Sequence, residues 1–286
     1  MKINVNGLIS DSKDAVVSVL DHGFLFGEGV YETVRTYKRK PFLLGRHLLR
    51  LRNSAYMINL LVPLSDEQFS HRISETISQS QAIEELSIRI ILTRGPGELS
   101  YDPTRCPDTS VVIIVQPLRE ISSKTLNSGI EIAFSTFIRN HPMAINPLIK
   151  SNNLLNNALA MQEALKQGLS ETLMRNYKEQ LVECAQSNFF IVRNGEVITP
   201  PISAGLLEGV TRNLIFEIGV LAGVPIREEV FFEADLDSAQ EAFLTSTTRE
   251  IIPVTRVGKH TIGNGNPGPT TRTLMDNFSR LVSELI

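Results

Sequence analysis

Apolar residues recur at two spacings along the chain, and the short spacing of strands dominates the first part. Short strand-like runs, broken by glycines and charged turns, are expected at 3–5, 16–20, 30–37 and 41–44. Over 46–60 the apolar residues return at roughly helical intervals, and a second helix is plausible over 65–80. Two strong strands follow at 87–93 and 110–115.

A polar stretch without a clear period lies between the two halves of the chain. It precedes a new strand at 129–134, so we predict an N-terminal domain over 1–118, a linker over 119–128 and a larger C-terminal domain over 129–286. Further strands are expected at 181–192 and 241–245, and helices at 151–167, 204–222 and 270–286. Each half therefore mixes both kinds of element, which predicts an α/β (α+β) protein with a sheet packed against helices in each domain.

Composition narrows the function more than the fold. The chain has 286 residues, 42% of them apolar, and a formal net charge of −3, so no broad basic surface suggests nucleic acid or membrane as a partner. No apolar run is long enough to span a membrane and the N-terminus lacks a leader-like segment, so a cytoplasmic location is expected. Cys106 and Cys184 form no CxxC pair, and no histidine cluster suggests a metal, so buried reduced thiols are expected. Small-molecule chemistry is the better expectation.

Lys150 has an unusual setting. It follows the apolar tripeptide at 147–149 and precedes a predicted helix for which Ser151 is a suitable N-cap. An ammonium group among apolar neighbours loses hydration, and the neutral amine is then a competent Schiff-base nucleophile. Taken alone, the segment fits a solvated lysine at a helix start better.

Further segments change that balance. They are DHGFLFGEGVYE at 21–32, RHLLRL at 46–51, LVECAQSNF at 181–189, GLLEGVTR at 205–212 and FLTSTTREIIP at 243–253. Together with the lysine segment, and in this order over nearly the whole chain, they resemble the class IV (fold type IV) pyridoxal-phosphate-dependent aminotransferase family. That group includes branched-chain and D-amino-acid transaminases and aminodeoxychorismate lyase. The resemblance implies a two-domain fold type IV enzyme with pyridoxal 5′-phosphate as cofactor.

The resemblance also implies a role for individual residues. Lys150 would carry the cofactor and then move a proton as a free amine. Glu183 would keep the cofactor ring nitrogen protonated, and Arg50 would bind the phosphate. Further cofactor-binding residues implied are Ser187, Asn188, Leu206, Gly209, Val210, Thr211, Ser246 and Thr247. The alternative for Glu183 is a strand-end carboxylate in water, which the alternation of Leu181, Glu183 and Ala185 on one face disfavours. Without the resemblance, the 209–211 and 246–247 segments are only a polar turn and a strand end.

Substrate contacts are implied for Tyr31, Arg35, Arg89, Thr248 and Arg249. A lone tyrosine such as Tyr31 more often belongs to a core. Arg89 stands among isoleucines, so it either crosses to a polar face or meets an anion. Arg249 could equally be a strand-end arginine in water. The Gly/Pro-rich loop at 93–103 reaches the partner's active site in the family, so the resemblance implies a homodimer.

Different segments point to different members of the family. The stretch 88–95 is most similar to archaeal branched-chain enzymes, 150–155 and 245–248 to D-amino-acid transaminases, and 31–33 and 183–188 to aminodeoxychorismate lyase. We therefore predict a transaminase that exchanges an amino group between an amino acid and a 2-oxo acid such as 2-oxoglutarate, with the branched-chain type slightly favoured. A D-amino-acid (or R-amine) transaminase is the alternative, and a lyase is third. A catalytically silent protein on the same fold is disfavoured by Lys150, Glu183 and Arg50.

Overall fold

The computed structural model describes residues 1–286, and the chain divides into two compact units. The first unit contains Met1–Arg119, Ile149–Asn153 and Ile286, and the second unit contains Glu120–Leu148 and Leu154–Leu285. The mixed fold expected from the sequence is confirmed, since each unit combines one sheet with helices.

The first unit is built on an antiparallel sheet of six strands in the order β2-β1-β6-β5-β3-β4. Its strands are β1 (Lys2–Val5), β2 (Leu8–Asp11), β3 (Gly29–Tyr37), β4 (Lys40–Pro41), β5 (Leu86–Thr93) and β6 (Ser110–Pro117). Its helices are α1 (His22–Leu25), α2 (Leu44–Met57), α3 (Asp66–Ser78) and the 3₁₀ turn η1 (Pro103–Arg105).

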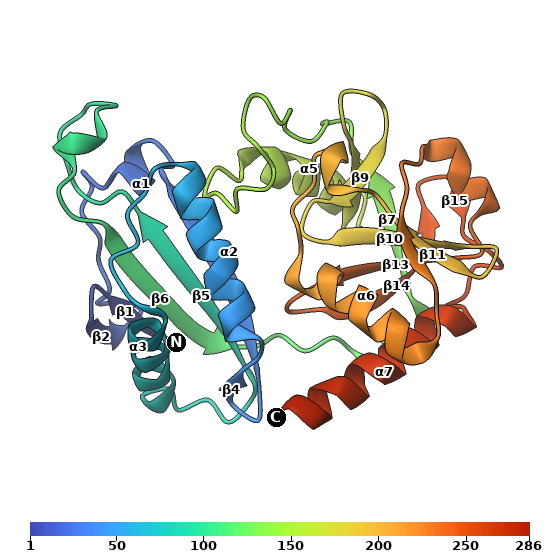
Figure 1. Cartoon of the computed structure of the whole chain (residues 1–286), viewed down its shortest axis with the longest axis horizontal. Coiled ribbons are helices and arrows are strands. Elements are labelled where there is room, and N and C mark those ends of the chain that lie inside the picture. Colours follow the sequence, from blue (N-terminus) through green and yellow to red (C-terminus); the bar gives the residue numbers. More distant parts are fainter. The chain divides into compact units, whose positions relative to one another are not determined.

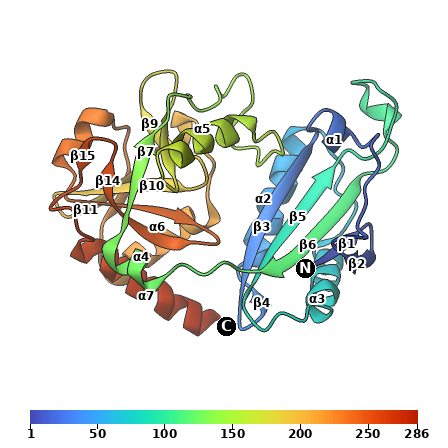
Figure 2. The same ribbon diagram turned by 180° about the vertical axis from the view of Figure 1, so that it is seen from behind.

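Residues of β3 and β5 alternate between a buried and a half-buried face, as the period of a strand requires. The apolar side chains of the buried face form one core with those of α2 and α3, and Figure 2 shows α2 running along the back of β3. Helix α3 begins where Ser65 and Gln68 bond reciprocally to each other's backbone N–H groups in a capping box.

The second unit has a nine-stranded sheet in the order β12-β11-β10-β13-β14-β7-β8-β9, with β15 beside β14. Strand β9 also pairs with β10, through Glu183 and Asn188, so the strands from β10 to β9 close into a ring. Helices α6 and α7 pack on each other and on β13 (Figure 1). The strands are β7 (Ile130–Phe134), β8 (Thr172–Arg175), β9 (Leu181–Cys184), β10 (Asn188–Arg193), β11 (Glu196–Thr199), β12 (Ile226–Glu228), β13 (Glu241–Ser246), β14 (Glu250–Val257) and β15 (His260–Thr261). The helices are α4 (Ser123–Ser128), α5 (Leu155–Lys166), α6 (Val210–Ala222), α7 (Pro269–Leu285) and the 3₁₀ turns η2 (Ile202–Ala204) and η3 (Glu233–Ser238).

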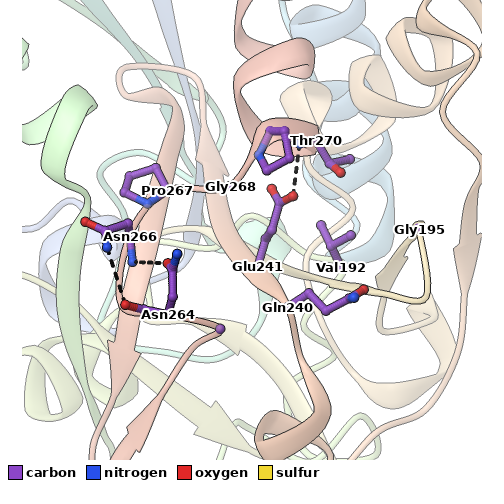
Figure 3. A pocket seen from close by; sticks show the side chains of 11 residues that line it. Val192, Gly195, Gln240, Glu241, Asn264, Asn266, Pro267, Gly268 and Thr270 are labelled. Carbon is purple, nitrogen blue, oxygen red and sulfur yellow. Dashed lines mark hydrogen bonds between the residues drawn. The ribbon is translucent and has the colours of Figure 1, made fainter.

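A hollow of about 490 Å³ lies beside the start of α7. Glu241 of β13 reaches into this helix end and accepts a hydrogen bond from the backbone N–H group of Thr270 at 2.9 Å (Figure 3). It also accepts one from the backbone N–H group of Thr271 at 2.7 Å. The carboxylate thus already satisfies donors that an anion would otherwise use. Glu241, which lines this hollow, therefore caps the start of α7.

The structure differs from the sequence expectations in several places. Residues 16–20 form no strand, and the run expected at 181–192 is two strands separated by a turn at 185–187. Residues 120–128 of the predicted linker, which include α4, belong to the second unit, whereas Ile149–Asn153 belongs to the first. None of the helices combines the length and the hydropathy needed to cross a membrane.

Candidate active site

The backbone around Lys150 is held at the edge of β3. The carbonyl of Lys150 accepts a hydrogen bond from the Tyr31 N–H at 2.9 Å, and Val30 and Ser151 form an antiparallel bridge. The N–H of Lys150 donates to the Oγ atom of Ser54 on α2 at 3.1 Å. Because these residues pair with β3, the helix α5 starts only at Leu155, so Ser151 is not its N-cap as the sequence had suggested. Lys150 is consequently fixed from two sides and is only half exposed.

The side chain of Lys150 lies over the ring of Tyr31. Its Nζ atom is 4.4 Å from the ring centroid, and the Cζ atom of Arg89 is 3.9 Å from the same centroid. Two cations thus share one aromatic ring, an arrangement that the electron-rich face of the ring stabilises. The strand alternation places Arg89 on the half-buried face of β5 and the isoleucines directly beside it on the other face. Arg89 therefore lies on a polar face, as one of the two expectations from the sequence had it. Arg35, on the same face of β3 as Tyr31, stacks on Tyr37 at 4.0 Å.

On the opposite face of β3, Glu32 is fully buried between β3 and α2. Its carboxylate accepts hydrogen bonds from Nδ1 of His47 at 2.8 Å and from Nε and Nη2 of Arg50 at 2.6 and 2.9 Å. Burial opposes ionisation of Glu32, but the Arg50 charge and the bonds from His47 and Arg50 outweigh it and hold the pKa of Glu32 well below its usual range. Arg50, the predicted phosphate residue, is therefore oriented by a buried carboxylate.

His47 is the neutral member of this cluster. Burial lowers the pKa of His47, the hydrogen bond to Glu32 offsets this only in part, and the charges of Arg50 and Lys150 lower it further. A neutral imidazole donates through Nδ1–H to Glu32 without adding a third positive charge beside Arg50 and Lys150. Sequence reasoning overlooked both Glu32 and His47, although Glu32 lies in a buried position of a strand and His47 three residues before Arg50 on one helix face.

Glu183 occupies β9 in the second unit, where its side chain is only 6% exposed. Its Oε1 atom accepts from Nε of Arg139 at 2.7 Å, and its Oε2 atom accepts from the N–H of Leu207 at 3.1 Å and from Nδ2 of Asn188 at 3.4 Å. These donors stabilise an ionised carboxylate. The alternative reading of Glu183 as a strand-end residue in water is wrong.

Arg139 was not foreseen as a partner of Glu183. It is buried, and its Nη1 atom also donates to Oδ1 of Asn156 at 3.3 Å. The sequence signal was weak, because a single arginine after apolar residues has no period or motif to mark it.

The start of α6 has backbone donors that no side chain caps. Gly209 is the N-cap, and it provides no side-chain hydrogen bond for the first N–H groups, those of Val210 and Thr211. A Cβ atom on Gly209 would come within 2.0 Å of Oδ1 of Asn188, so glycine is required for this close approach. Asn188 in turn donates to the carbonyl of Leu207 at 2.8 Å. Helix starts of this kind bind anions through their backbone donors and the helix dipole.

Two hydroxyl groups of β13, against which α6 packs, are buried without a hydrogen-bond partner. They are Oγ1 of Thr245 and Oγ of Ser246. Buried polar atoms in proteins are nearly always bonded, so these two hydroxyl groups are candidates for contacts with a ligand. Leu206, another residue predicted at the cofactor, is fully buried and packs in a small apolar cluster with Val182 and Ala204.

Residues 247–249 form the turn between β13 and β14, since Ser246 pairs with Glu250. Nη2 of Arg249 donates to Glu171 and, at 2.5 Å, to Oγ of Ser187. Arg249 has a side chain that is only 17% exposed. The reading of Arg249 as a solvated strand-end residue is therefore wrong. The Ser187 hydroxyl also donates to Glu171 at 3.3 Å, so Ser187 contacts both members of the Arg249–Glu171 ion pair.

The predicted residues thus form local clusters within each unit. The first unit contains Tyr31, Arg35, Arg50, Arg89 and Lys150, and the second contains Glu183, Ser187, Asn188, Leu206, Gly209, Val210, Thr211, Ser246, Thr247, Thr248 and Arg249. Both cysteines are free thiols, and burial is the main cause that raises the pKa of each, so neither is primed as a nucleophile.

Comparison with known proteins identifies the family of the chain. Residues 29–257 match the sequence model of the amino-transferase class IV family. The putative branched-chain-amino-acid aminotransferase of Methanocaldococcus jannaschii is 36% identical over 279 residues, which cover 97% of this chain and 95% of the relative. The D-alanine aminotransferase of Listeria monocytogenes is 31% identical over 295 residues, covering 100% of this chain and 99% of the relative.

Solved structures support the same assignment at the level of the fold. The branched-chain amino acid aminotransferase of Escherichia coli superposes with a TM-score of 0.93 and 28% identity, covering 98% of this chain and 94% of that one. A second branched-chain amino acid aminotransferase, solved with pyridoxamine 5′-phosphate, gives a TM-score of 0.92 and 26% identity, covering 98% of this chain and 93% of that one. The chain therefore belongs to the class IV aminotransferase family and is an aminotransferase.

Proposed function

We propose that this aminotransferase works with pyridoxal 5′-phosphate, which Lys150 carries through its amine. The observation that carries the proposal is the fixation of Lys150 by β3 and Ser54, with its Nζ atom 4.4 Å from the Tyr31 ring centroid. The unpartnered Ser246 hydroxyl and the uncapped start of α6 fit a phosphate group. When bound, pyridoxal phosphate supplies an electron sink for negative charge at the substrate Cα.

The residues of the chain would then divide the work. As a free amine, Lys150 would move a proton between the substrate Cα and the C4′ atom of the cofactor within each half of the exchange. Glu183, held ionised by Arg139 and the Leu207 N–H, keeps a proton on the cofactor ring nitrogen. In the first unit, Arg50, which Glu32 orients, is proposed as a phosphate-binding residue. Others are proposed in the second unit. The phosphate-binding residues proposed there are Gly209, Val210, Thr211, Ser246 and Thr247, and Ser187, Asn188 and Leu206 support the cofactor around Glu183.

For substrate we propose a branched-chain amino acid and a 2-oxo acid such as 2-oxoglutarate. The more similar of the two relatives named above carries a branched-chain description, and Arg89 and Arg35 on the polar face of the first sheet offer cations for carboxylates. Tyr31 in the first unit and Thr248 in the second are proposed as further substrate contacts. A D-amino-acid transaminase is the second candidate, favoured by the D-alanine aminotransferase relative, and a lyase is the third.

The cofactor proposal has a direct test. The purified protein should show an absorbance band from covalently attached pyridoxal phosphate, and borohydride reduction followed by peptide mapping should label Lys150. Lys150→Ala should abolish turnover, whereas Lys166→Ala, at the exposed end of α5, should leave it unchanged. Labelling of another lysine would refute the assignment.

Substrate is decided by a panel of amino acids. L-leucine, L-valine, D-alanine and D-glutamate are supplied with 2-oxoglutarate or pyruvate, and amino-group transfer is measured for each pair. Higher kcat/KM for L-leucine than for D-alanine supports the branched-chain assignment, and the reverse order replaces it with the D-amino-acid assignment. Release of pyruvate from aminodeoxychorismate, with no 2-oxo acid added, would indicate the lyase.

We also propose that the chain works as a homodimer. Several large apolar side chains of the first unit are exposed in the single chain, namely Val16, Val17, Val19, Leu20, Phe24, Leu99 and Tyr101. They come from two neighbouring segments, because the Gly97 N–H donates to the Leu20 carbonyl at 3.2 Å. Exposed apolar clusters of this kind mark interaction surfaces. Light scattering should report a dimer for the wild type and a monomer for Val19→Asp, and a monomeric wild type would refute the proposal.

A further inference from the structure

Glu171 is a buried carboxylate for which the reaction has no obvious use. It lies directly before β8, is fully buried, and accepts the Thr172 N–H at 3.1 Å and the Ser187 hydroxyl at 3.3 Å. A buried charge is costly unless it is paired. Its ionic partner is Arg249, which reaches it from the turn at 247–249.

That turn adopts a backbone conformation that needs support. Glu250, which follows it, has φ of +57°, in the left-handed region that residues with a Cβ atom disfavour. Such conformations persist where the surrounding structure imposes them, and they cluster at functional sites. Arg249 is the turn residue whose side chain bonds outside the hairpin, to Glu171 and to Ser187 in the turn at 185–187. The pair therefore joins three segments that are distant in sequence.

We propose that Arg249 is a positioning residue that ties the 247–249 turn to Glu171 and thereby fixes the Ser246 and Thr247 hydroxyls on the cofactor phosphate. The inference rests on the proposed function, because that function assigns the phosphate to this turn. Glu171 neutralises the Arg249 guanidinium, so this arginine does not serve as a receptor for a second substrate carboxylate. Its loss should weaken phosphate binding and affect all amino-acid substrates alike.

Two ligands that differ only in the phosphate isolate this effect. The apoprotein is titrated with pyridoxal 5′-phosphate and, separately, with pyridoxal, and binding is followed by absorbance because the chain has no tryptophan. The dissociation constant for pyridoxal divided by that for pyridoxal 5′-phosphate, here called the phosphate ratio, reports the phosphate contacts alone. For Arg249→Ala we expect this ratio to fall about tenfold, equivalent to about 1.4 kcal/mol. Arg249→Lys should recover part of the loss, because an ammonium group still pairs with Glu171. Arg256→Ala is the matched control on β14, with a side chain that is 50% exposed, and should not change the ratio.

A double variant separates positioning from stability. Arg249→Ala leaves Glu171 buried and unpaired, so Tm should fall, and adding Glu171→Gln removes that charge and should restore part of Tm. The phosphate ratio should stay low in the double variant, because the turn remains untied. Recovery of the ratio together with Tm would mean a merely structural role and would overturn the proposal.

The failure of this inference and that of the proposed function can be told apart. A wild type that binds pyridoxal as tightly as pyridoxal phosphate would refute the phosphate site and with it the proposed function. A wild type that prefers pyridoxal phosphate, together with an unchanged ratio in Arg249→Ala, would refute only the role of Arg249.

Discussion

Replacing Glu32 by glutamine tests the buried cluster behind β3. Glutamine keeps the shape of the side chain but removes the charge that His47 and Arg50 contact at 2.6 to 2.9 Å. Arg50, with a side chain only 13% exposed, then loses its buried anion. Breaking a buried ion pair by removing one partner costs about 3 to 5 kcal/mol. The Gln amide oxygen still accepts one hydrogen bond, so we expect the lower end, about 3 kcal/mol.

Calorimetry or circular dichroism melting measures this loss. At roughly 3 °C per kcal/mol for a chain of this size, Tm should fall by about 10 °C. Glu75→Gln is the control, because the Glu75 side chain is 52% exposed and its contact with His71 is a surface pair, which should contribute about 0.5 kcal/mol or less. Glu32→Gln combined with Arg50→Met also removes the cation that faced Glu32 and should regain part of the loss. A Tm for Glu32→Gln as high as that of Glu75→Gln would refute the reasoning.

Other consequences are open to measurement in the same way. The pKa of buried His47 is lowered, so below about pH 6.5 this residue binds more protons in the unfolded chain than in the folded one. Tm should therefore fall from pH 7 to pH 5. The His47→Gln variant should show a smaller fall over this range. The depressed pKa of Glu32 adds a second fall below about pH 4.5, which a Glu32→Gln melting series should lack. Arg139→Met should lower the free energy of unfolding by about 3 kcal/mol, because Glu183 stays buried without its ionic partner. An unchanged melting curve would contradict the pairing. Glu183→Gln should slow Cα proton removal in single turnovers far more than it weakens cofactor binding, and an equal half-reaction rate would remove Glu183 from the mechanism. Arg89→Ala should reduce kcat/KM by roughly tenfold to a hundredfold. If Arg89 binds a side-chain carboxylate, the loss should affect glutamate alone. If Arg89 binds the α-carboxylate, the loss should affect every substrate.

The sequence predicted most regular elements because their patterns are local. Alternation in β3 and β5 and the helical spacing of α2 and α3 depend on residues close in the chain, and the structure has these elements within a few residues of the expected bounds. The prediction of a strand at 16–20 was wrong for the same reason, because it too rested on a local pattern. Its valines favour a strand locally, but no neighbouring strand pairs with it, so it stays irregular and exposed.

Charged residues that act through distant partners were harder to predict. Arg139 and Glu171 have meaning only beside Glu183 and Arg249, which are 44 and 78 residues away in the sequence. No periodicity encodes such a pair. The motif residues themselves were found because the family resemblance marks them, whereas their supporting partners lie outside the motifs.

The lysine segment has a consequence for how the protein can be divided. Ile149–Asn153 belongs to the first unit, although the chain on both sides of it belongs to the second. A fragment that ends at Arg119 therefore lacks the backbone that pairs with the Tyr31 N–H and leaves the edge of β3 exposed. During synthesis this part of the first unit can form only after residue 153 has been made. A gene split at 119 would thus place Lys150 and the Tyr31 ring beneath its side chain on different polypeptides.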